Sequence, residues 1–208
     1  MDWDNDGKMD LIAGDTKGQV WLFLNVGTKE KPELARGKLI EADGKPIAAG
    51  SNKLAGTHSK LHMADWDGDG LKDLLIGHDN TIVFYKNVGT PSEPRFAAPA
   101  LIKIPEGNFP LRPSPYIIDW DGDGKKDLLV GTEEPKVIFY RNIGTDKNPK
   151  LDRGKALDLK VPAGDAGSRW RIDVADWNND GKMDILVGNF YSGSGQKAGG
   201  NVWLFLGK

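Results

Sequence analysis

Four short acidic loops hold the residues of this chain that are best suited to chemistry. The pattern D-x-[DN]-x-D-G-x-x-D occurs at Asp2–Asp10, Asp65–Asp73, Asp119–Asp127 and Asp176–Asp184. It places side-chain oxygens at positions 1, 3, 5 and 9, and a main-chain carbonyl is available at position 7. Glycine at position 6 permits the sharp turn that lets alternate side chains converge. The pattern therefore predicts sites for a hard divalent cation.

Calcium is the ion that this donor set favours. Oxygen ligands without His or Cys disfavour transition metals, and Mg²⁺ resists dehydration and needs a tighter octahedron. The loops are not EF-hands, because their twelfth positions hold Ala13, Ile76, Val130 and Val187 instead of a bidentate Glu. We expect the position 9 aspartate to close each site, and up to four Ca²⁺ ions in all. The predicted ligands are Asp2, Asp4, Asp6, Lys8, Asp10, Asp65, Asp67, Asp69, Leu71, Asp73, Asp119, Asp121, Asp123, Lys125, Asp127, Asp176, Asn178, Asp180, Lys182 and Asp184.

The distribution of charge supports this interpretation. The loops carry 15 of the 30 acidic residues, and like charges this close together raise carboxylate pKa values unless a cation is bound. Asp and Gly also favour plain turns, but fourfold recurrence at matched spacing favours metal binding. Asn178 replaces an aspartate in the fourth loop, so we expect that loop to bind most weakly. A structural role for the metal is expected, since protein oxygens fill its coordination.

The elements that must position these loops are short strands. The loops begin 63, 54 and 57 residues apart, so the chain is a repeat. Apolar runs follow the loops at Leu11–Gly14, Leu74–Gly77, Leu128–Gly131 and Ile185–Gly188. Aromatic runs come next, at Val20–Leu24, Ile82–Lys86, Val137–Arg141 and Val202–Leu206. Such β-branched and aromatic runs, bounded by Gly, Asn or Asp, are typical of strands, and no segment keeps a helical period.

Each repeat thus holds four strands. One precedes the loop, predicted at Lys60–Ala64, Tyr116–Ile118 and Ile172–Ala175 in the last three repeats. The apolar run, the aromatic run and a variable segment supply the others. Four strands at this period predict propeller blades, which bury their faces against their neighbours.

We therefore expect an all-β fold, a β-propeller or part of one, with a calcium loop between the first two strands of each blade. The chain is predicted to form a single repeat domain whose four blades span about 1–58, 59–112, 113–168 and 169–208. The first blade lacks the strand before its loop, and the last lacks the strand after its aromatic run. Exposed edges of this kind favour self-association.

The loops and their flanking strands resemble the FG-GAP/VCBS repeat family. The resemblance rests on Asp-x-Asp-x-Asp-Gly-x-x-Asp-Leu followed by two apolar residues and Gly, as in Asp119–Gly131, and it covers essentially the whole chain. The aromatic run followed by Asn-Val-Gly-Thr is similar to the bacterial secreted form. The resemblance implies calcium-binding propeller blades, usually seven or eight to a ring. It leaves function open, because members range from integrin α-chain propellers to a fungal lectin and some rhamnogalacturonan lyases.

A second candidate site lies near the last hairpin. Gly188 and the aromatic run are 14 positions apart, against 6, 5 and 6 in the other repeats. This connection is expected on the face opposite the calcium loops, and loops on a rigid scaffold often bind ligands. A flexible glycine-rich loop is the alternative. The candidate ligand-binding residues are Phe190, Tyr191, Gln196, Lys197, Arg169, Trp170 and Arg171.

Tryptophan recurs at position 2 of every loop, as Trp3, Trp66, Trp120 and Trp177. An indole can stack on a sugar ring or fill a core. Recurrence at one repeat position favours packing between blades.

Composition excludes several function classes. The chain has no Cys, so it forms neither disulfides nor thiolate zinc sites. No apolar window is long enough for a membrane span, and a net charge of −2 without basic runs disfavours nucleic acid. His58, His62 and His78 assemble no recognisable catalytic set, and no G-x-S-x-G motif occurs. We therefore expect a chain that is not an enzyme.

The function expected is that of an extracellular or cell-surface binding or adhesion module, with a carbohydrate or protein ligand. Millimolar extracellular Ca²⁺ suits such loops. The location rests on calcium chemistry and on the resemblance, because the acidic start Met1–Asp4 is unlike a signal peptide. Two alternatives stay open: a self-assembling structural or protein-interaction part-propeller, and a fragment of a secreted polysaccharide lyase.

Overall fold

The computed structural model describes residues 1–48, 60–162, 164–191 and 198–207. These residues form sixteen strands in small antiparallel sheets, which confirms the all-β expectation. The described part of the chain contains no helix with the length and apolar character that a membrane span requires. Two compact units, Met1–Ile102 and Lys103–Lys208, make up the chain.

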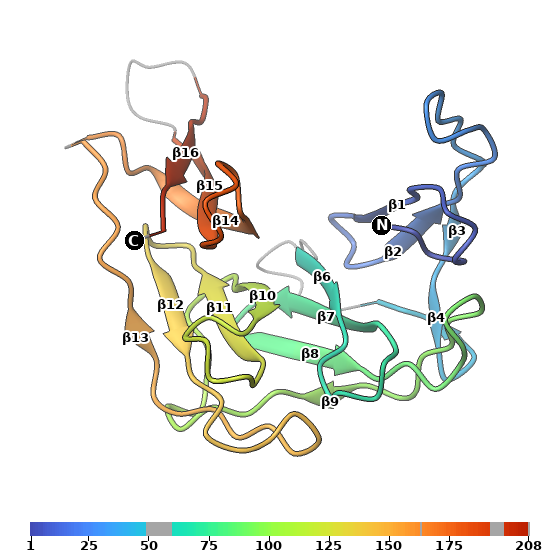
Figure 1. The fold of residues 1–208 in the computed structure, drawn as a ribbon, viewed down its shortest axis with the longest axis horizontal. Coiled ribbons are helices and arrows are strands. Elements are labelled where there is room, and N and C mark those ends of the chain that lie inside the picture. The colour runs from blue at the N-terminus through green and yellow to red at the C-terminus, as the bar shows by residue number, and fades with distance from the viewer. Residues whose placement is uncertain (49–59, 163, 192–197, 208) are drawn as a thin grey trace. The chain divides into compact units, whose positions relative to one another are not determined.

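The first unit contains two sheets and a small hairpin (Figure 1). The three-stranded sheet has the order β1-β2-β3, and the four-stranded sheet has the order β6-β7-β8-β9. The strands are β1 (Leu11–Gly14), β2 (Val20–Phe23), β3 (Lys38–Leu39), the hairpin β4 (Glu41–Ala42) and β5 (Lys45–Pro46), β6 (Lys60–Ala64), β7 (Asp73–His78), β8 (Thr81–Tyr85) and β9 (Ala100–Leu101).

The second unit repeats this arrangement with a four-stranded sheet, β10-β11-β12-β13, and a three-stranded sheet, β14-β15-β16. The strands are β10 (Ser114–Ile118), β11 (Asp127–Gly131), β12 (Val137–Tyr140), β13 (Lys155–Ala156), β14 (Ser168–Ala175), β15 (Asp184–Phe190) and β16 (Val202–Phe205). In both units each sheet follows chain order, as expected for a blade-like meander. The finer blade boundaries stay a prediction.

The strands before the acidic loops lie where the repeat predicted them. Lys60–Ala64 is found with the same bounds, and Tyr116–Ile118 begins two residues earlier, at Ser114. The strand predicted at Ile172–Ala175 extends back to Ser168, because its register shifts between Ser168 and Arg171 while it continues to pair with β15. Each acidic loop therefore leads directly into the second strand of its repeat.

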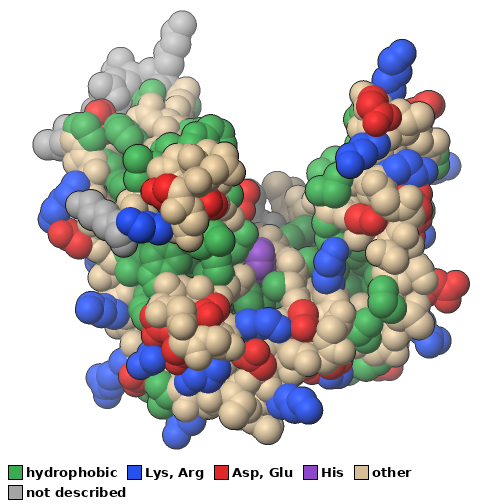
Figure 2. All heavy atoms as spheres, viewed as in Figure 1, with side chains coloured by type: hydrophobic (Ala, Val, Ile, Leu, Met, Phe, Trp, Pro, Cys, Tyr) green, Lys and Arg blue, Asp and Glu red, His purple; other side chains and the backbone are tan. Residues whose placement is uncertain are grey.

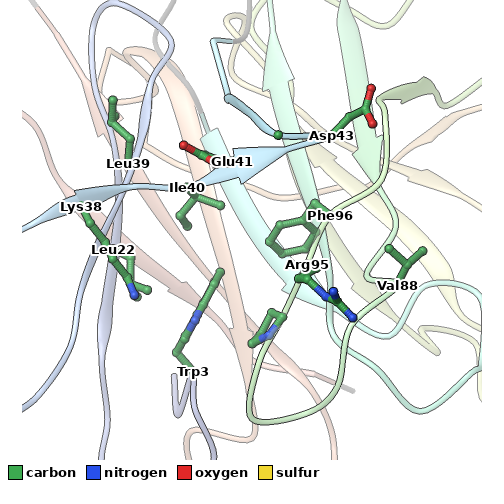
Figure 3. Close-up of a pocket in the computed structure, with 12 residues that line it drawn as sticks. Trp3, Leu22, Lys38, Leu39, Ile40, Glu41, Asp43, Val88, Arg95 and Phe96 are labelled. Atoms are coloured by element: carbon green, nitrogen blue, oxygen red, sulfur yellow. The ribbon is translucent and has the colours of Figure 1, made fainter.

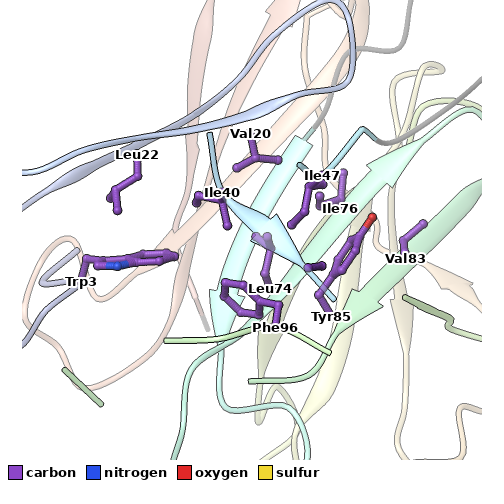
Figure 4. Close-up of a cluster of buried hydrophobic side chains, with 11 residues drawn as sticks. Trp3, Val20, Leu22, Ile40, Ile47, Leu74, Ile76, Val83, Tyr85 and Phe96 are labelled. Carbon is purple, nitrogen blue, oxygen red and sulfur yellow. The ribbon is translucent and has the colours of Figure 1, made fainter. Parts of the chain in front are cut away.

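The core of the first unit joins the faces of two successive repeats. Val20 and Leu22 from β2 pack with Leu74 and Ile76 from β7, together with further buried side chains (Figure 4). The second unit has the same construction, with side chains of β11 and β12 packed on those of β14 and β15. Face-to-face sheet packing of this kind buries the apolar side chains that alternate along each strand. It holds the loops at the ends of rigid strands.

The loop tryptophans contribute unequally to this packing. The Trp3 ring lies 6.0 Å from the Phe96 ring, so it packs the first repeat on the second, as its recurrence predicted. Trp66 is also buried, and Trp120 is half-buried against the second core. Trp177 is 61% exposed, so the packing role does not extend to the last copy.

Acidic and basic side chains are intermixed on the face drawn in Figure 2. This agrees with a net charge near zero.

A buried asparagine shapes the turn after the third strand of three repeats. Asn25, Asn87 and Asn142 are at most 3% exposed, and each side-chain carbonyl accepts two backbone N–H bonds of 2.9–3.2 Å. The glycine two residues later is needed because a Cβ at Gly144 would lie 2.4 Å from the Asn148 carbonyl oxygen. The Asn-x-Gly-Thr motif is therefore a folded turn rather than a plain linker.

We predict that Asn142→Ala destabilises the protein by about 1–3 kcal/mol, because it removes the acceptor of the Gly144 and Lys150 N–H groups. Urea unfolding in EDTA measures the change. Asn148→Ala, at an exposed position of the same turn, is the matched control and should change stability by less than about 0.5 kcal/mol. Equal losses in the two variants would contradict the role given to Asn142.

Candidate metal centre

The acidic loops fold through their own carboxylates. In all four, the position 1 aspartate accepts N–H bonds of 2.9–3.2 Å from positions 5 and 6. The position 6 glycines have φ between +83° and +89°, as the sharp turn requires. The position 7 residues Lys8, Leu71, Lys125 and Lys182 donate their backbone N–H to the position 5 carboxylate. The turn is thus the same in every loop.

The position 9 aspartate joins its loop to the third strand. One carboxylate oxygen accepts the N–H of the loop tryptophan, and the other accepts the N–H of the second residue beyond the end of that strand. These bonds are 2.7–3.0 Å long, and the four carboxylates, Asp10, Asp73, Asp127 and Asp184, are at most 8% exposed. The position 9 carboxylate therefore forms a buried joint, with short hydrogen bonds, between its loop and the end of the third strand.

Burial and the neighbouring negative charges make the ionised form of the position 9 carboxylate unfavourable. Burial raises the pKa of Asp73 to about 6, although two N–H donors oppose the shift, and the nearby Asp67 and Asp69 charges raise it further. The pKa of Asp127 is raised for the same reasons. A bound cation would stabilise the charged form in each case.

Three loops bring their carboxylates together as the spacing predicted. In the triads Asp2–Asp4–Asp6, Asp65–Asp67–Asp73 and Asp119–Asp121–Asp127, one oxygen of each residue lies within 4.8 Å of the others. Oxygens at this separation can share one ion at the Ca²⁺–oxygen distance of about 2.4 Å.

The fit to a cation has a second, independent basis. One oxygen of Asp4 and one of Asp67 are buried and have no hydrogen-bond partner in the described part of the chain. A buried carboxylate oxygen without a donor is costly, and a cation would satisfy it. The all-oxygen donor set fits calcium.

The fourth loop keeps the turn without forming such a triad among the described residues. Asn178 stands at position 3, and its amide donates a 3.0 Å bond to Asp180. Asp176, Asp180 and Asp184 hold their usual backbone partners. The expectation that this loop binds most weakly stays a prediction.

Two loops contain a basic side chain that the spacing did not predict. Lys86, which follows β8, bonds through its ammonium to both Asp67 and Asp69. Arg141, which follows β12, contacts Asp121 at 2.6 Å and Asp123 at 2.9 Å. These contacts raise the pKa of Lys86 and help lower that of Asp69. The corresponding residues after β2 and β16 are Leu24 and Leu206, so the outer loops receive no cation from the third strand. Lysines of the loops themselves also pair with position 5: Lys8 lies 2.8 Å from Asp6, and Lys125 lies 3.0 Å from Asp123.

Comparison with known proteins decides the family. The model of the FG-GAP-like repeat matches residues 65–130 and 119–187, a span that contains the last three acidic loops. The chain belongs to the FG-GAP-like repeat family. Repeats of this family imply propeller blades, in agreement with the small antiparallel sheets.

No curated protein matches this FG-GAP chain. Among solved structures it is similar to the Photorhabdus luminescens Tc holotoxin pore, with 17% identity and a TM-score of 0.45 over 86% of its own residues. The chain spans 8% of the length of that toxin chain.

The candidate ligand residues of the FG-GAP chain differ in their surroundings. Arg169 and Phe190 lie together, with the guanidinium 5.0 Å from the centre of the ring, and Tyr191 follows Phe190. Trp170 is 1% exposed and donates its indole N–H to the Ala166 carbonyl, so it belongs to the core. Arg171 is half-buried beside it in β14, and Gln196 and Lys197 lie outside the described residues.

A hollow of about 710 Å³ lies in the first unit (Figure 3). Trp3, Ile40 and Phe96 form much of its apolar lining, and Asp43 and Arg95 contribute charges. Trp3 belongs to the first acidic loop, but none of the lining residues is a predicted calcium ligand.

We predict that Lys86→Met tightens calcium binding at the second loop by about three- to tenfold, because it removes a cation that competes for Asp67 and Asp69. Titration calorimetry on calcium-stripped protein measures the change. Leu24→Lys introduces the same charge at the matched position of the first loop and should weaken calcium binding there. If both variants titrate like the parent protein, this competition does not exist.

Proposed function

We propose that this chain is a set of four calcium-loaded propeller blades acting as an extracellular, non-catalytic binding or adhesion module. The observation that carries the proposal is the carboxylate triad at the joint between an acidic loop and its sheet. Positions 1, 3, 5 and 9 of each loop, with the position 7 carbonyl, would hold the ion. Calcium would supply positive charge that neutralises the crowded carboxylates and links them.

The residues of the loop explain how an ion would act on a blade. The position 9 carboxylate already bonds the loop and the end of the third strand, through Trp66 and Asn87 in the second repeat. Neutralising Asp73 removes the cost of its buried charge without breaking these bonds. Calcium would therefore make the strand ends rigid and leave the opposite face for a ligand.

The ligand class is a carbohydrate in the first instance. Arg169 and Phe190 place a guanidinium group and an aromatic ring near one another in the second unit. Aromatic faces stack on sugars, and guanidinium groups bind their polar substituents. A fragment of a secreted polysaccharide lyase is the alternative that would add catalysis to such a site.

We predict that calcium stabilises the protein against heat. One site saturated at a hundred times its Kd contributes about 2.7 kcal/mol, which corresponds to several degrees in Tm. Asp67→Asn should lose the part of the calcium stabilisation that the second loop contributes. Asp158→Asn, at an exposed position outside the loops, should keep the full stabilisation. Scanning calorimetry with calcium and with EDTA measures this, and the absence of any calcium effect would refute the proposal.

The binding role needs its own readout. A glycan array probed with calcium and with EDTA should show calcium-dependent binding if the ligand is a carbohydrate. Silence in both buffers by folded protein would exclude a lectin and leave a protein partner. Release of unsaturated sugar from pectic substrates would favour the lyase.

A specific observation also favours self-association as a second role. Strand β16 is an edge of its sheet, and β1 is an edge of its own. Val202 and Leu204 in β16 are 75% and 41% exposed, and Leu206, just beyond its end, is 54% exposed. An exposed apolar edge can pair with a strand of another chain. The occupant we propose is a second copy of this chain, whose β1 edge would receive β16.

We predict a mass that rises above 22.7 kDa with protein concentration in light scattering. Leu204→Lys should lower the degree of association, because a charge on an edge strand opposes pairing. Leu111→Lys, at a similarly exposed leucine outside any strand, should not. A constant monomer mass over a hundredfold range of concentration would exclude this role.

A further inference from the structure

Three arginines meet around one glutamate in the second unit. Arg112 precedes β10, Glu133 follows β11, and Arg169 and Arg171 lie in β14. Arg112 and Arg169 contact the two oxygens of Glu133 at 3.3 and 3.4 Å. We call these four residues the arginine cluster. Counted over them, three guanidinium groups face one carboxylate, a formal charge of +2.

Arg171 is the most confined member of the cluster. Its guanidinium bonds to the carbonyls of Arg112 and Trp170 at 3.4 and 3.2 Å. Burial lowers the pKa of Arg171 to about 10; the charge of Glu133 opposes this shift, and the charges of Arg112 and Arg169 add to it. A desolvated cation among like charges costs stability, so stability of the fold does not explain the arrangement.

The backbone holds the cluster in an uncommon conformation. Arg112 and Arg169 have φ values of +54° and +59°, in the left-handed region that bulky residues rarely adopt. Arg169 also lies within the register shift of β14, a kind of irregularity that redirects side chains. Such features persist where the surrounding structure enforces them, and they gather at binding sites.

Hydrogen bonds from three segments enforce this geometry. The Arg169 and Trp170 N–H groups donate to the carbonyls of Glu133 and Thr132 at 2.8 and 2.9 Å. The Glu133 N–H donates to the Leu111 carbonyl at 2.9 Å. The guanidinium groups are therefore brought together by main-chain contacts and do not depend on a ligand to assemble.

An aromatic ring adjoins the charges. The Arg169 guanidinium lies 5.0 Å from the centre of the Phe190 ring, and Tyr191 follows in the chain. The Tyr191 ring lies against Gly199, where an added Cβ would come within 2.9 Å of its hydroxyl. Planar guanidinium groups match a carboxylate, and an aromatic ring matches the apolar face of a pyranose.

We propose that the arginine cluster, together with the Phe190 ring, binds the carboxylate and ring of an acidic sugar. This inference rests on the proposed function of the chain as a carbohydrate-binding module and names the ligand class. The carboxylate would add the negative charge that Glu133 alone does not supply. The sugar ring would lie toward Phe190.

The test uses the full chain with calcium present and small probes of known charge. Saturation-transfer NMR compares methyl glucuronide and methyl galacturonide with the neutral methyl glucoside and methyl galactoside. Tetraglutamate tests whether any carboxylate suffices. We expect binding of the uronides, weakening as salt increases, and at least tenfold weaker binding of the neutral sugars and of the peptide.

Variants test the residues themselves. Arg169→Gln, at a side chain that is 41% exposed, should weaken uronide binding about tenfold, and Arg171→Met should do the same if it folds. Glu133→Gln removes the competing carboxylate and should tighten uronide binding severalfold. Arg153→Gln, at an exposed arginine elsewhere in the unit, is the control and should change nothing.

The outcomes separate this inference from the proposed function. Equal binding of neutral and acidic sugars, unchanged in the variants, would overturn the acidic-sugar site and leave a carbohydrate module. Tetraglutamate binding as well as the uronides would overturn the sugar class. If no probe binds while calcium still raises Tm, the ligand class is wrong but the calcium-dependent fold stands.

Discussion

A buried carboxylate at the ninth position of each acidic loop is the interaction on which the rest of the structure depends. Asp73 shows the arrangement most fully, since it has no exposed surface and accepts N–H bonds from the loop and from beyond the third strand. Without these bonds the loop, the second strand and the third strand would have no common joint. In the second and third loops the same carboxylate, Asp73 or Asp127, also belongs to the metal triad. The fold therefore places the cost of a buried charge where a cation can relieve it.

The repeats share this joint but not their electrostatic surroundings. The residue after the third strand is Leu24, Lys86, Arg141 and Leu206 in the four copies. In the middle two, the basic side chain bonds the carboxylates at positions 3 and 5, so these loops hold a cation of their own. A bound ion would compete there with a charge held by the third strand, whereas in the first loop the competing cation is Lys8 of the loop itself, 2.8 Å from Asp6. Identical motifs are thus not equivalent sites.

The sequence predicts what is local or periodic and misses what is neither. The strand Lys60–Ala64 and the carboxylate triads follow from runs and spacings within one repeat. Lys86 lies 19 residues from Asp67, and nothing in the loop pattern points to it; a comparison of the residues after each aromatic run would have suggested a difference.

The arginine cluster shows the same limit more strongly. Arg169 and Arg171 were predicted as ligand residues from their place before the last loop, but Arg112 and Glu133 were not. Arg112 lies 59 residues before Arg171, and Glu133 lies 36 residues before Arg169. Trp170, predicted beside them, faces the core because alternate residues of a strand point to opposite sides. Tertiary contacts, rather than spacing, decide which of these side chains can meet a ligand.

The topology places the acidic loop and the arginine cluster at opposite ends of the same two strands, β10 and β11. The loop Asp119–Asp127 joins the end of β10 to the start of β11. Ser114 at the start of β10 pairs with Gly131 at the end of β11, so Arg112 and Glu133 flank the other end. A metal in that loop cannot contact a ligand held by the arginines. In this chain, calcium would act on the rigidity of the strand ends, and the positive charge offered to an anion comes from the protein itself.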